Sequence, residues 1–380
     1  MNTPKIRFKG FKDDWEQRKL GELGEIMTGS TPSTSKPEYY SENGIPWVTP
    51  TDIDALTISD TPRKLSEEGI KVGRVVPANT ILCTCIASIG KNALLMVKGS
   101  FNQQINSLTP SAENDSYFLL TESELWSEKM KRMAASGTMQ IVNKTEFSEL
   151  VTMVPSLDEQ KIIGFYFRNI DNLITLHQRK CDETKKLKKF MLQKMFPKKD
   201  AKKPEIRFAG FTDDWEQRKL VDVVDVRSGR DYKHLEEGDI PVYGTGGYML
   251  SVNEALSDDE DAIGIGRKGT IDNPYILRAP FWTVDTLFYA VPRDKYDLNF
   301  VFDIFQNVNW KAKDESTGVP SLSKATINAV ETLMPEYAEQ KKIGEYFSYL
   351  DNFITLHQRK CDELKEFKKY MLQNMFPQKG

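Results

Sequence analysis

The sequence predicts an α+β protein with a pseudo-twofold internal duplication, in which two mixed α/β domains are separated by two long helices that form an antiparallel coiled coil. Three observations lead to this prediction. Two segments of the first half return almost unchanged in the second half. The closing segment of each half carries a heptad pattern without glycine or proline, and the stretches between the repeated segments share little.

The repeated segments open and close each half of the chain. IRFKGFKDDWEQRKL, from Ile6 to Leu20, returns at residues 206–220 with thirteen of fifteen positions identical. DNLITLHQRKCDE, from Asp171 to Glu183, returns at residues 351–363 with twelve of thirteen identical. The offsets are 200 and 180 residues, so the two inserts differ in length by 20. Two units of this length do not make a solenoid, and they predict one scaffold that carries two different inserts.

The closing segments are predicted to be the long helices. Their apolar residues follow a 4-3-4-3 spacing, which is typical of a coiled coil. No glycine or proline occurs in residues 165–196 or 345–376, and Pro197 and Pro377 end the helices. A helix of roughly 40 residues spans about 60 Å, and each would bury its apolar stripe against the other. The predicted core positions are Ile163, Phe167, Ile170, Ile174, His177, Cys181, Ile343, Phe347, Leu350, Ile354, His357 and Cys361.

Two core positions in each helix allow an alternative interpretation. His177 and Cys181 lie four residues apart, as do His357 and Cys361, so the four could form a Cys2His2 zinc site where the helices cross. The favoured interpretation has no metal: histidine fills one core layer and cysteine fills the next as a small apolar residue. A zinc site would require one particular register of the two helices.

The inserts are predicted to be mixed α/β domains with many turns. Residues 80–86 form a short apolar run typical of a strand, and residues 123–133 are predicted to be helical. Glycine turns separate short strands in DIPVYGTGGYML and AIGIGRKGTI of the second insert. Trp15 and Trp215, inside the repeated DDWEQRKL, are expected to anchor each domain to the helices. The linker at residues 198–206 is the expected break between the two halves.

Composition limits the class of protein. The 380 residues are 39% hydrophobic and 28% charged, which is typical of a folded, water-soluble protein. The sequence has no apolar run long enough to cross a membrane and no secretory leader, so we expect a cytoplasmic protein. Four cysteines predict no disulfide framework. The net charge of −3 neither indicates nor excludes a nucleic-acid binder, because groove readers can be basic only locally.

Several stretches resemble one protein family when they are taken in order. WEQRKLGELGEIMTGSTPSTSKPEYYSENGIPWVTPTDI, FNQQINSL and ASGTMQIVNKTEF lie in the first half, and IGRKGTI, PFWTVDTLF and STGVPSLSKATI in the second. PSLDEQKIIGFYF and PEYAEQKKIGEYF then lead into the long helices. This layout resembles the specificity subunits of type I restriction-modification systems over nearly the whole chain.

The resemblance implies a non-catalytic DNA-binding subunit without a cofactor. It would recognise a bipartite site on double-stranded DNA and position two methyltransferase subunits and the restriction/translocase subunits. It implies target-recognition domains at residues 1–154 and 204–334, with helical spacers at residues 155–203 and 335–380. The outer faces of the helices and the Glu-Gln-Lys turns before them are expected to bind the partners.

Motifs of a catalytic subunit are weak by comparison. Asp272-Asn273-Pro274-Tyr275 approaches the loop of adenine methyltransferases but lacks the second proline, and GIGRKG (residues 264–269) lacks the spacing of a phosphate loop. A catalytic subunit of the same system is therefore disfavoured. A second rival is a coiled-coil adaptor that binds proteins without DNA specificity.

DNA contacts are expected from Lys, Arg, Asn, Gln and Thr side chains in the family-like stretches, because these groups reach base edges and phosphates. A structural side-chain network is the alternative for Gln103 and Gln104, and a solvated turn is the alternative for Arg267 and Lys268. The nine lysines of residues 185–203 could follow the DNA backbone, or form a solvated helix end. The predicted contact residues are Lys91, Gln103, Gln104, Thr138, Gln140, Asn143, Lys144, Arg227, Arg230, Lys233, Arg267, Lys268 and Lys324.

Overall fold

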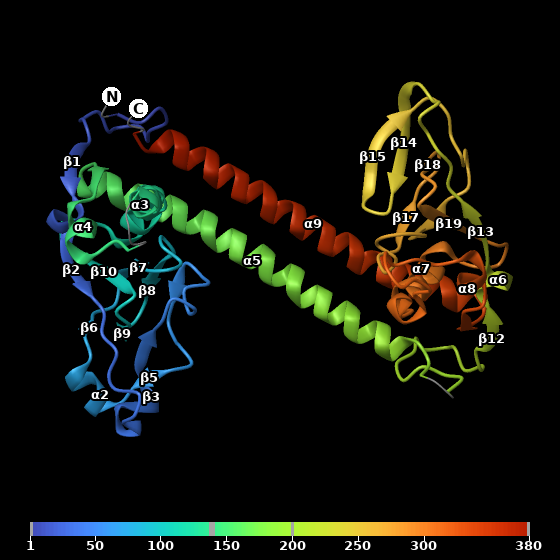
Figure 1. Ribbon diagram of the computed structural model, residues 1–380, viewed down its shortest axis with the longest axis horizontal. Helices are drawn as coiled ribbons and strands as arrows, with labels where there is room; N and C mark the ends of the chain where they lie inside the picture. Colours follow the sequence, from blue (N-terminus) through green and yellow to red (C-terminus); the bar gives the residue numbers. More distant parts are fainter. Residues whose placement is uncertain (1–2, 137–140, 199–200, 378–380) are drawn as a thin grey trace. The chain divides into compact units, whose positions relative to one another are not determined.

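The computed structural model describes residues 3–136, 141–198 and 201–377. Its contacts divide the chain into two compact units (Figure 1), one formed by Met1–Leu176 with Lys360–Gly380 and the other by His177–Arg359. The long helices α5 (Leu157–Met195) and α9 (Tyr337–Met375) each contribute to both units. Each unit therefore contains one α/β domain and a segment of both long helices.

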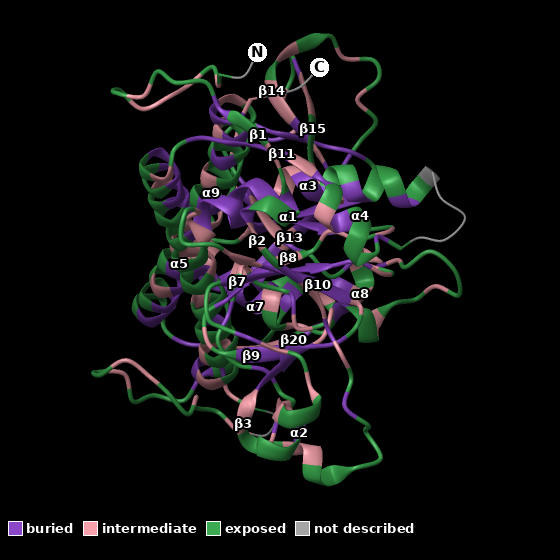
Figure 2. Ribbon diagram, turned by 90° about the vertical axis from the view of Figure 1, so that its left-hand side faces the viewer, coloured by how far each residue is buried: buried purple, intermediate pink, exposed green. Residues whose placement is uncertain are grey.

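The first unit is built on a five-stranded sheet in the order β2-β10-β7-β8-β4. A two-stranded sheet, β1-β11, and a four-stranded sheet, β5-β3-β9-β6, complete its β structure. Strands β7, β8 and β10 are largely buried, which Figure 2 shows in purple. The strands are β1 (Glu16–Lys19), β2 (Gly24–Thr28), β3 (Tyr40–Val48), β4 (Thr57–Ile58), β5 (Lys64–Leu65), β6 (Val75–Val76), β7 (Thr80–Thr84), β8 (Asn92–Leu95), β9 (Gly99–Phe101), β10 (Ile105–Pro110) and β11 (Val151–Val154). The helices are α1 (Leu20–Leu23), the 3-10 turn η1 (Pro37–Tyr39), α2 (Glu67–Val72), α3 (Ser116–Ser136) and α4 (Lys144–Glu149).

The second unit repeats this plan with fewer strands. Its main sheet has the order β13-β19-β16-β17, beside a two-stranded sheet, β12-β20, and a three-stranded sheet, β15-β14-β18. The strands are β12 (Glu216–Lys219), β13 (Val224–Ser228), β14 (Glu237–Gly244), β15 (Gly247–Val252), β16 (Ala262–Gly266), β17 (Tyr275–Leu277), β18 (Trp282–Thr283), β19 (Leu287–Pro292) and β20 (Glu331–Met334). The helices are α6 (Leu220–Val223), α7 (Leu298–Asn307), the 3-10 turn η2 (Trp310–Lys313) and α8 (Lys324–Asn328).

The inserts share a sheet plan although their sequences share little. The order β2-β10-β7-β8 of the first unit matches β13-β19-β16-β17 of the second, and all these neighbours pair antiparallel. In both units the strand from the repeated EQRK segment pairs with the strand that precedes the long helix, with Glu16 opposite Val154 and Glu216 opposite Met334. The predicted fold class, two mixed α/β domains with long helices, is confirmed.

The long helices run antiparallel within each unit. Successive contacts move toward higher residue numbers on one helix and toward lower residue numbers on the other. In the first unit Cys361 Sγ lies 3.9 Å from Ile174 O, and Lys368 Nζ lies 2.9 Å from Asp171 Oδ1. In the second unit Cys181 Sγ lies 3.9 Å from Ile354 O, and Lys188 Nζ lies 2.5 Å from Asp351 Oδ1. Of the predicted core positions, Ile174, His177 and Ile354 are half-buried and the other nine are buried.

Aromatic clusters join each domain to its helices. Trp15 is buried, and its ring centroid lies 5.7 Å from those of Phe118 in α3 and Phe376 at the end of α9. Trp215 makes the equivalent contacts at 5.9 Å from Phe196 and 5.7 Å from Phe300. Each tryptophan therefore lies between a domain helix and the end of a long helix, as an anchor would.

The long helices begin before the predicted uninterrupted stretch and continue through Gly164 and Gly344. A Cβ atom at Gly164 would lie 2.9 Å from Phe118 N, and one at Gly344 would lie 2.7 Å from Phe300 N. Glycine therefore lets the first turns of α3 and α7 approach the long helix closely. The helix tolerates glycine here because tertiary packing outweighs local propensity.

Candidate nucleic-acid interface

Three predicted DNA-contacting cations, Arg267, Lys268 and Lys324, meet at one hollow in the second unit. The hollow has a volume of about 570 Å³. Hydroxyl side chains and one exposed carboxylate, that of Asp285, complete much of its lining. Its residues are Ser228, Arg267, Lys268, Asp285, Thr286, Phe288, Ser321, Leu322, Ser323 and Lys324.

Backbone hydrogen bonds hold the turn that presents Arg267 and Lys268. Arg267 N–H donates to Thr286 O at 2.8 Å, and Leu322 N–H donates to Arg267 O at 3.0 Å. Gly269 has a φ of +96°, which favours glycine, and its N–H donates to Pro320 O at 2.8 Å. The turn after β16 is therefore attached on both sides, and its cations project from a defined backbone.

The three cations differ in their surroundings. The Arg267 guanidinium is exposed, lies 5.8 Å from the centre of the Phe288 ring, and donates to Asp285 O at 3.3 Å. Lys268 is exposed, and Lys324 is half-buried at the start of α8. Positive charge and hydroxyl groups around one hollow favour an anionic group such as a DNA phosphate.

The β14–β15 ribbon lies beside this turn. A Cβ atom on Gly269 would lie 3.9 Å from Thr245 Oγ1 at the ribbon tip. Tyr248 and Met249, just after the tip, are 63% and 49% exposed. A two-stranded ribbon fits the major groove, so the ribbon adds a second feature suited to DNA. The glycine turn in DIPVYGTGGYML indicated a hairpin, but the exposure of Tyr248 and Met249 could not be read from the sequence.

Arg230 and Lys233 lie in the segment that leads into the ribbon, and both are exposed. Arg230 N–H donates to Thr283 O at 2.8 Å, and its carbonyl accepts from Trp282 Nε1 at 3.0 Å. Lys233 lines a second hollow along the ribbon that also includes Tyr248. These two residues extend the cationic surface from the turn toward the ribbon.

Arg227 is not a free cation. Its Nε donates to Asp225 Oδ2 at 2.7 Å, and its Nη2 donates to Glu260 Oε1 at 3.3 Å. Hydrogen bonds to Glu260 and then Asp225 raise the pKa of Arg227. Two carboxylates of the same unit therefore balance the charge of Arg227, and its contact with a phosphate stays a prediction.

Three of the predicted contact residues of the first unit form hydrogen bonds to other groups of the same unit. Gln104 follows its structural alternative, because its Oε1 accepts from Asn102 Nδ2 at 3.1 Å and its carbonyl accepts from Cys85 N at 2.8 Å. Asn143 caps α4 by accepting from Glu146 N at 3.0 Å. Gln103 is exposed and bonds the Thr31 hydroxyl.

The remaining predicted residues of the first unit are two lysines and two positions that the structure does not describe. Lys91 and Lys144 are exposed. Thr138 and Gln140 lie outside the described residues. The first unit thus presents fewer exposed cations than the second among the predicted residues that the structure describes.

A family model described as the type I restriction modification DNA specificity domain matches residues 12–186 and 212–366. The chain belongs to the specificity-subunit family. The MjaIX specificity subunit of Methanocaldococcus jannaschii is 28% identical over 229 residues, which cover 57% of this chain and 53% of that protein. The HindI specificity subunit of Haemophilus influenzae is 29% identical over 171 residues, 42% of this chain and 37% of that protein.

Other similarities extend along the whole chain. The match spans about half or less of those two relatives, but the MjaVIII specificity subunit of M. jannaschii is 23% identical over 403 residues, 95% of this chain and 91% of that protein. The crystal structure of the type I restriction-modification S subunit from M. genitalium aligns over 100% of both chains with a TM-score of 0.76 and 17% identity. The S subunit from M. genitalium therefore shares this chain's fold.

The glutamates of the Glu-Gln-Lys turns in this specificity-subunit chain are structural joints, whereas Lys161 and Lys341 of the same turns are exposed, so partner binding there stays a prediction. Glu159 and Glu339 are buried in two-pronged ion pairs with Arg7 and Arg207, whose Nε atoms lie 2.7 Å from the carboxylates. Buried side chains bonded within one unit are not available to a partner.

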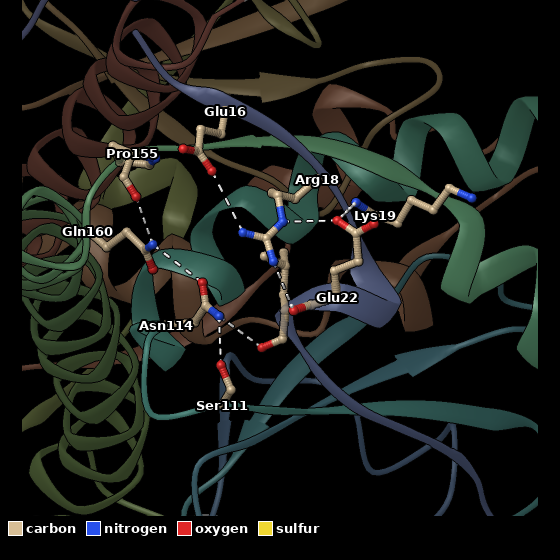
Figure 3. Close-up of polar contacts among 9 residues, drawn as sticks. Glu16, Arg18, Lys19, Glu22, Ser111, Asn114, Pro155 and Gln160 are labelled. Carbon is tan, nitrogen blue, oxygen red and sulfur yellow. Dashed lines mark hydrogen bonds and ion pairs between the residues drawn. The ribbon is translucent and has the colours of Figure 1, made fainter. Parts of the chain in front are cut away.

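Figure 3 shows how the glutamine of the first turn is held. Gln160 Nε2 donates to Pro155 O at 3.0 Å and to Asn114 Oδ1 at 3.3 Å. Asn114 in turn donates to Leu23 O at 3.0 Å, three residues after the repeated segment, and Arg18 of that segment bonds Glu22 at 2.9 Å. The start of α5 is thus tied to the first repeated segment by the Arg7–Glu159 pair and, through Asn114, to the residues that follow it.

The Asp272–Tyr275 motif and the histidine pair, considered as catalytic and metal-binding respectively, make contacts within the second unit of this specificity subunit. Asp272 pairs with Lys311 at 2.6 Å, and the Tyr275 hydroxyl donates to Gly244 O at 2.5 Å. His177 Nδ1 lies 2.7 Å from His357 Nδ1, but no group of three or more potential ligands occurs among the described residues. None of the described helices combines the length and apolarity needed to cross a membrane.

Proposed function

We propose that this specificity subunit is a non-catalytic DNA reader that recognises a bipartite site. Residues 1–154 and 204–334 would each read one half-site, and residues 155–203 and 335–380 would hold them a fixed number of base pairs apart. One observation carries this proposal: the two units share one sheet plan, but the turns that follow β7 and β16 at equivalent places carry different side chains. One frame with two surfaces suits two unlike targets of one chemical class.

The partners that we propose are two methyltransferase subunits and, through them, the restriction/translocase subunits, in the cytoplasm. The large apolar side chains exposed on the long helices include Leu187 and Phe190 on α5, and Phe367 and Tyr370 at the positions 180 residues later on α9. Residues three apart on a helix share a face, so Leu187 and Phe190 form one patch, and Phe367 and Tyr370 form the matching patch in the other unit. A patch that occurs twice suits one partner that docks twice.

The docking proposal is tested by counting bound methyltransferase subunits. We expect Leu187→Glu/Phe190→Glu to lower the ratio from two subunits to one, and Phe367→Glu/Tyr370→Glu to do the same. Native mass spectrometry of the co-purified complex measures the ratio. Val72→Glu, at an exposed apolar position of α2, is the control. Two bound subunits in both variants would contradict this docking surface.

The recognition proposal is tested by mapping adenine methylation after co-expression with the methyltransferase subunit. We expect one split motif with two unlike halves at a fixed spacing. Replacing residues 21–154 with those of another specificity subunit should change one half only. If the complex assembles and no methylated motif appears, the chain is a protein-only adaptor and the DNA assignments fail.

A further inference from the structure

The domain at residues 204–334 is acidic overall, yet several of its cations gather in one place. It contains 14 basic and 23 acidic side chains, a net charge of −9, whereas residues 1–154 contain 17 and 19, a net charge of −2. A domain with this excess of acid repels DNA from most directions. Five exposed or half-buried cations nevertheless lie around the hollow and the ribbon: Arg230, Lys233, Arg267, Lys268 and Lys324.

Matching backbone contacts identify the equivalent positions of the first unit. Cys85 N–H donates to Gln104 O at 2.8 Å, as Arg267 N–H donates to Thr286 O. The bridge between Ile86 and Ile141 matches the bridge between Lys268 and Ser321. Cys85 and Ile86 therefore occupy the places of Arg267 and Lys268, and Lys144, the first residue of α4, occupies the place of Lys324.

The first unit is neutral at two of these three places. Cys85 is buried, and burial raises the pKa of its thiol to about 11, so the group is uncharged at neutral pH. Ile86 is half-buried against the apolar core. Lys91 and Arg74 are exposed nearby, but the Arg74 guanidinium already bonds Thr28 O. Charge thus converges on one hollow in the second unit and is dispersed in the first.

From these observations we propose that Arg267, Lys268 and Lys324 form a phosphate clamp, and that this clamp contributes more to the salt dependence of DNA binding than the equivalent positions of the first unit. The inference rests on the proposed DNA-reading function and deepens it. Hydroxyl groups around the three cations suit phosphate oxygens. The acidic remainder of the domain directs the duplex to this surface, whereas the equivalent places of the first domain carry one cation, Lys144.

The test is DNA binding by the full chain in complex with its methyltransferase subunits, measured by fluorescence anisotropy over a range of KCl concentrations. The logarithm of affinity falls with the logarithm of salt concentration by about 0.9 for each phosphate contact. We expect Arg267→Ala/Lys268→Ala/Lys324→Ala to lower this slope by about 2 to 3 for duplexes of any sequence. Lys144→Ala should lower it by about 1 or less.

Two controls keep the inference distinct from the proposed function. Lys219→Ala/Lys295→Ala removes two exposed cations of the same domain outside the hollow and should leave the slope unchanged. The methylated motif should also stay the same in the triple variant, because phosphate contacts carry no sequence information. A wild-type slope in the triple variant, or a changed base in one half-site, would overturn the clamp. Absence of any motif for the unaltered complex would instead overturn the proposed function.

Discussion

The two units differ in the turns that follow β7 and β16, but in both of them a buried lysine joins the α/β domain to the long helices. We call this contact the joint. In the first unit Lys368 of α9 bonds Asp171 of α5 at 2.9 Å and Glu124 of α3 at 2.7 Å. In the second, Lys188 of α5 bonds Asp351 of α9 at 2.5 Å and Gln306 of α7 at 2.7 Å. Substituting a buried lysine that has carboxylate partners leaves buried charge unpaired and destabilises the fold, whereas exposed side chains can be substituted at little cost.

The comparison predicts the largest effects at the joint. Lys368→Met would leave Asp171, whose side chain is 7% exposed, without its cation, and we expect a loss of about 3–5 kcal/mol in the free energy of unfolding. Lys188→Met should cost less, because Asp351 is 36% exposed and can be hydrated. Chemical denaturation of the full chain measures both losses.

A rescue variant separates charge from packing at the first joint. Asp171→Asn retains an acceptor for the Tyr117 hydroxyl, which donates to Asp171 Oδ2 at 3.0 Å. Adding it to Lys368→Met should restore more than half of the lost stability. Lys369→Met, at the exposed neighbouring position, is the matched control and should change stability by less than about 0.5 kcal/mol. Equal losses in Lys368→Met and Lys369→Met would show that the joint contributes nothing.

The next effect concerns a buried acid of the first unit. Glu122 in α3 is fully enclosed, and burial raises its pKa to about 8, although the Thr152 hydroxyl and the Met153 N–H donate to its carboxyl group. The folded state therefore retains a proton that the unfolded chain releases near its ordinary pKa of 4.5. This contribution to stability is complete below that value and is lost as the pH rises toward 8.

Glu122→Gln should remove this loss. We expect the variant to exceed the unaltered chain in unfolding free energy by about 2–4 kcal/mol at pH 8 and by much less at pH 5. Thermal or urea unfolding at the two pH values measures the difference. Glu128→Gln, at an exposed position of α3, should show no such pH dependence. A parallel pH dependence in Glu122→Gln and the unaltered chain would contradict a protonated Glu122.

The smallest effect is expected at the contact between His177 and His357, which occupy equivalent positions of the two repeated helix segments. His177 and His357 lie 2.7 Å apart through their Nδ1 atoms, which requires one donor and one acceptor. Burial, then the nearby His177 and Lys180 charges, lowers the pKa of His357. Stability from this pair is therefore present above the unfolded value of 6.5 and is lost as the pH falls through the lowered pKa.

Replacing His357 should reduce that acid sensitivity. His357→Gln retains hydrogen-bonding capacity without a titrating group, so its unfolding free energy should vary less between pH 7 and pH 5 than that of the unaltered chain. His234→Gln, at an exposed position of the second domain, is the control. An unchanged pH dependence in His357→Gln would show that the pair does not couple to folding.

Most of the architecture could be predicted from patterns of fixed period. The repeats indicated a duplicated frame, and the heptad spacing placed Phe167, Cys181, Phe347 and Cys361 in the buried seam. The strand expected at residues 80–86 is β7, and the helix expected at residues 123–133 lies within the longer α3. Periodicity predicts these features because it depends only on which side of an element faces solvent.

The interface was less predictable because its residues come together from distant parts of the chain. Arg267, Lys268 and Lys324 were chosen from separate stretches, and only the bonds among β16, β19 and the loop before α8 place them around one hollow. Arg227 and Asn143 were chosen by the same chemical criteria, yet carboxylates and a helix cap already use them. A residue type indicates what a side chain can bond, but not which partner reaches it first.

The sequence by itself therefore determined the duplicated frame, the two long helices, the aromatic anchors and the family, because these depend on repetition and on the alternation of apolar and polar residues. Tertiary structure alone decided that the Glu and Gln residues of the Glu-Gln-Lys turns are buried, that the unlike inserts share one sheet order, and that cations converge in one unit and not in the other. Those features depend on contacts between residues far apart in the chain, which no local pattern encodes.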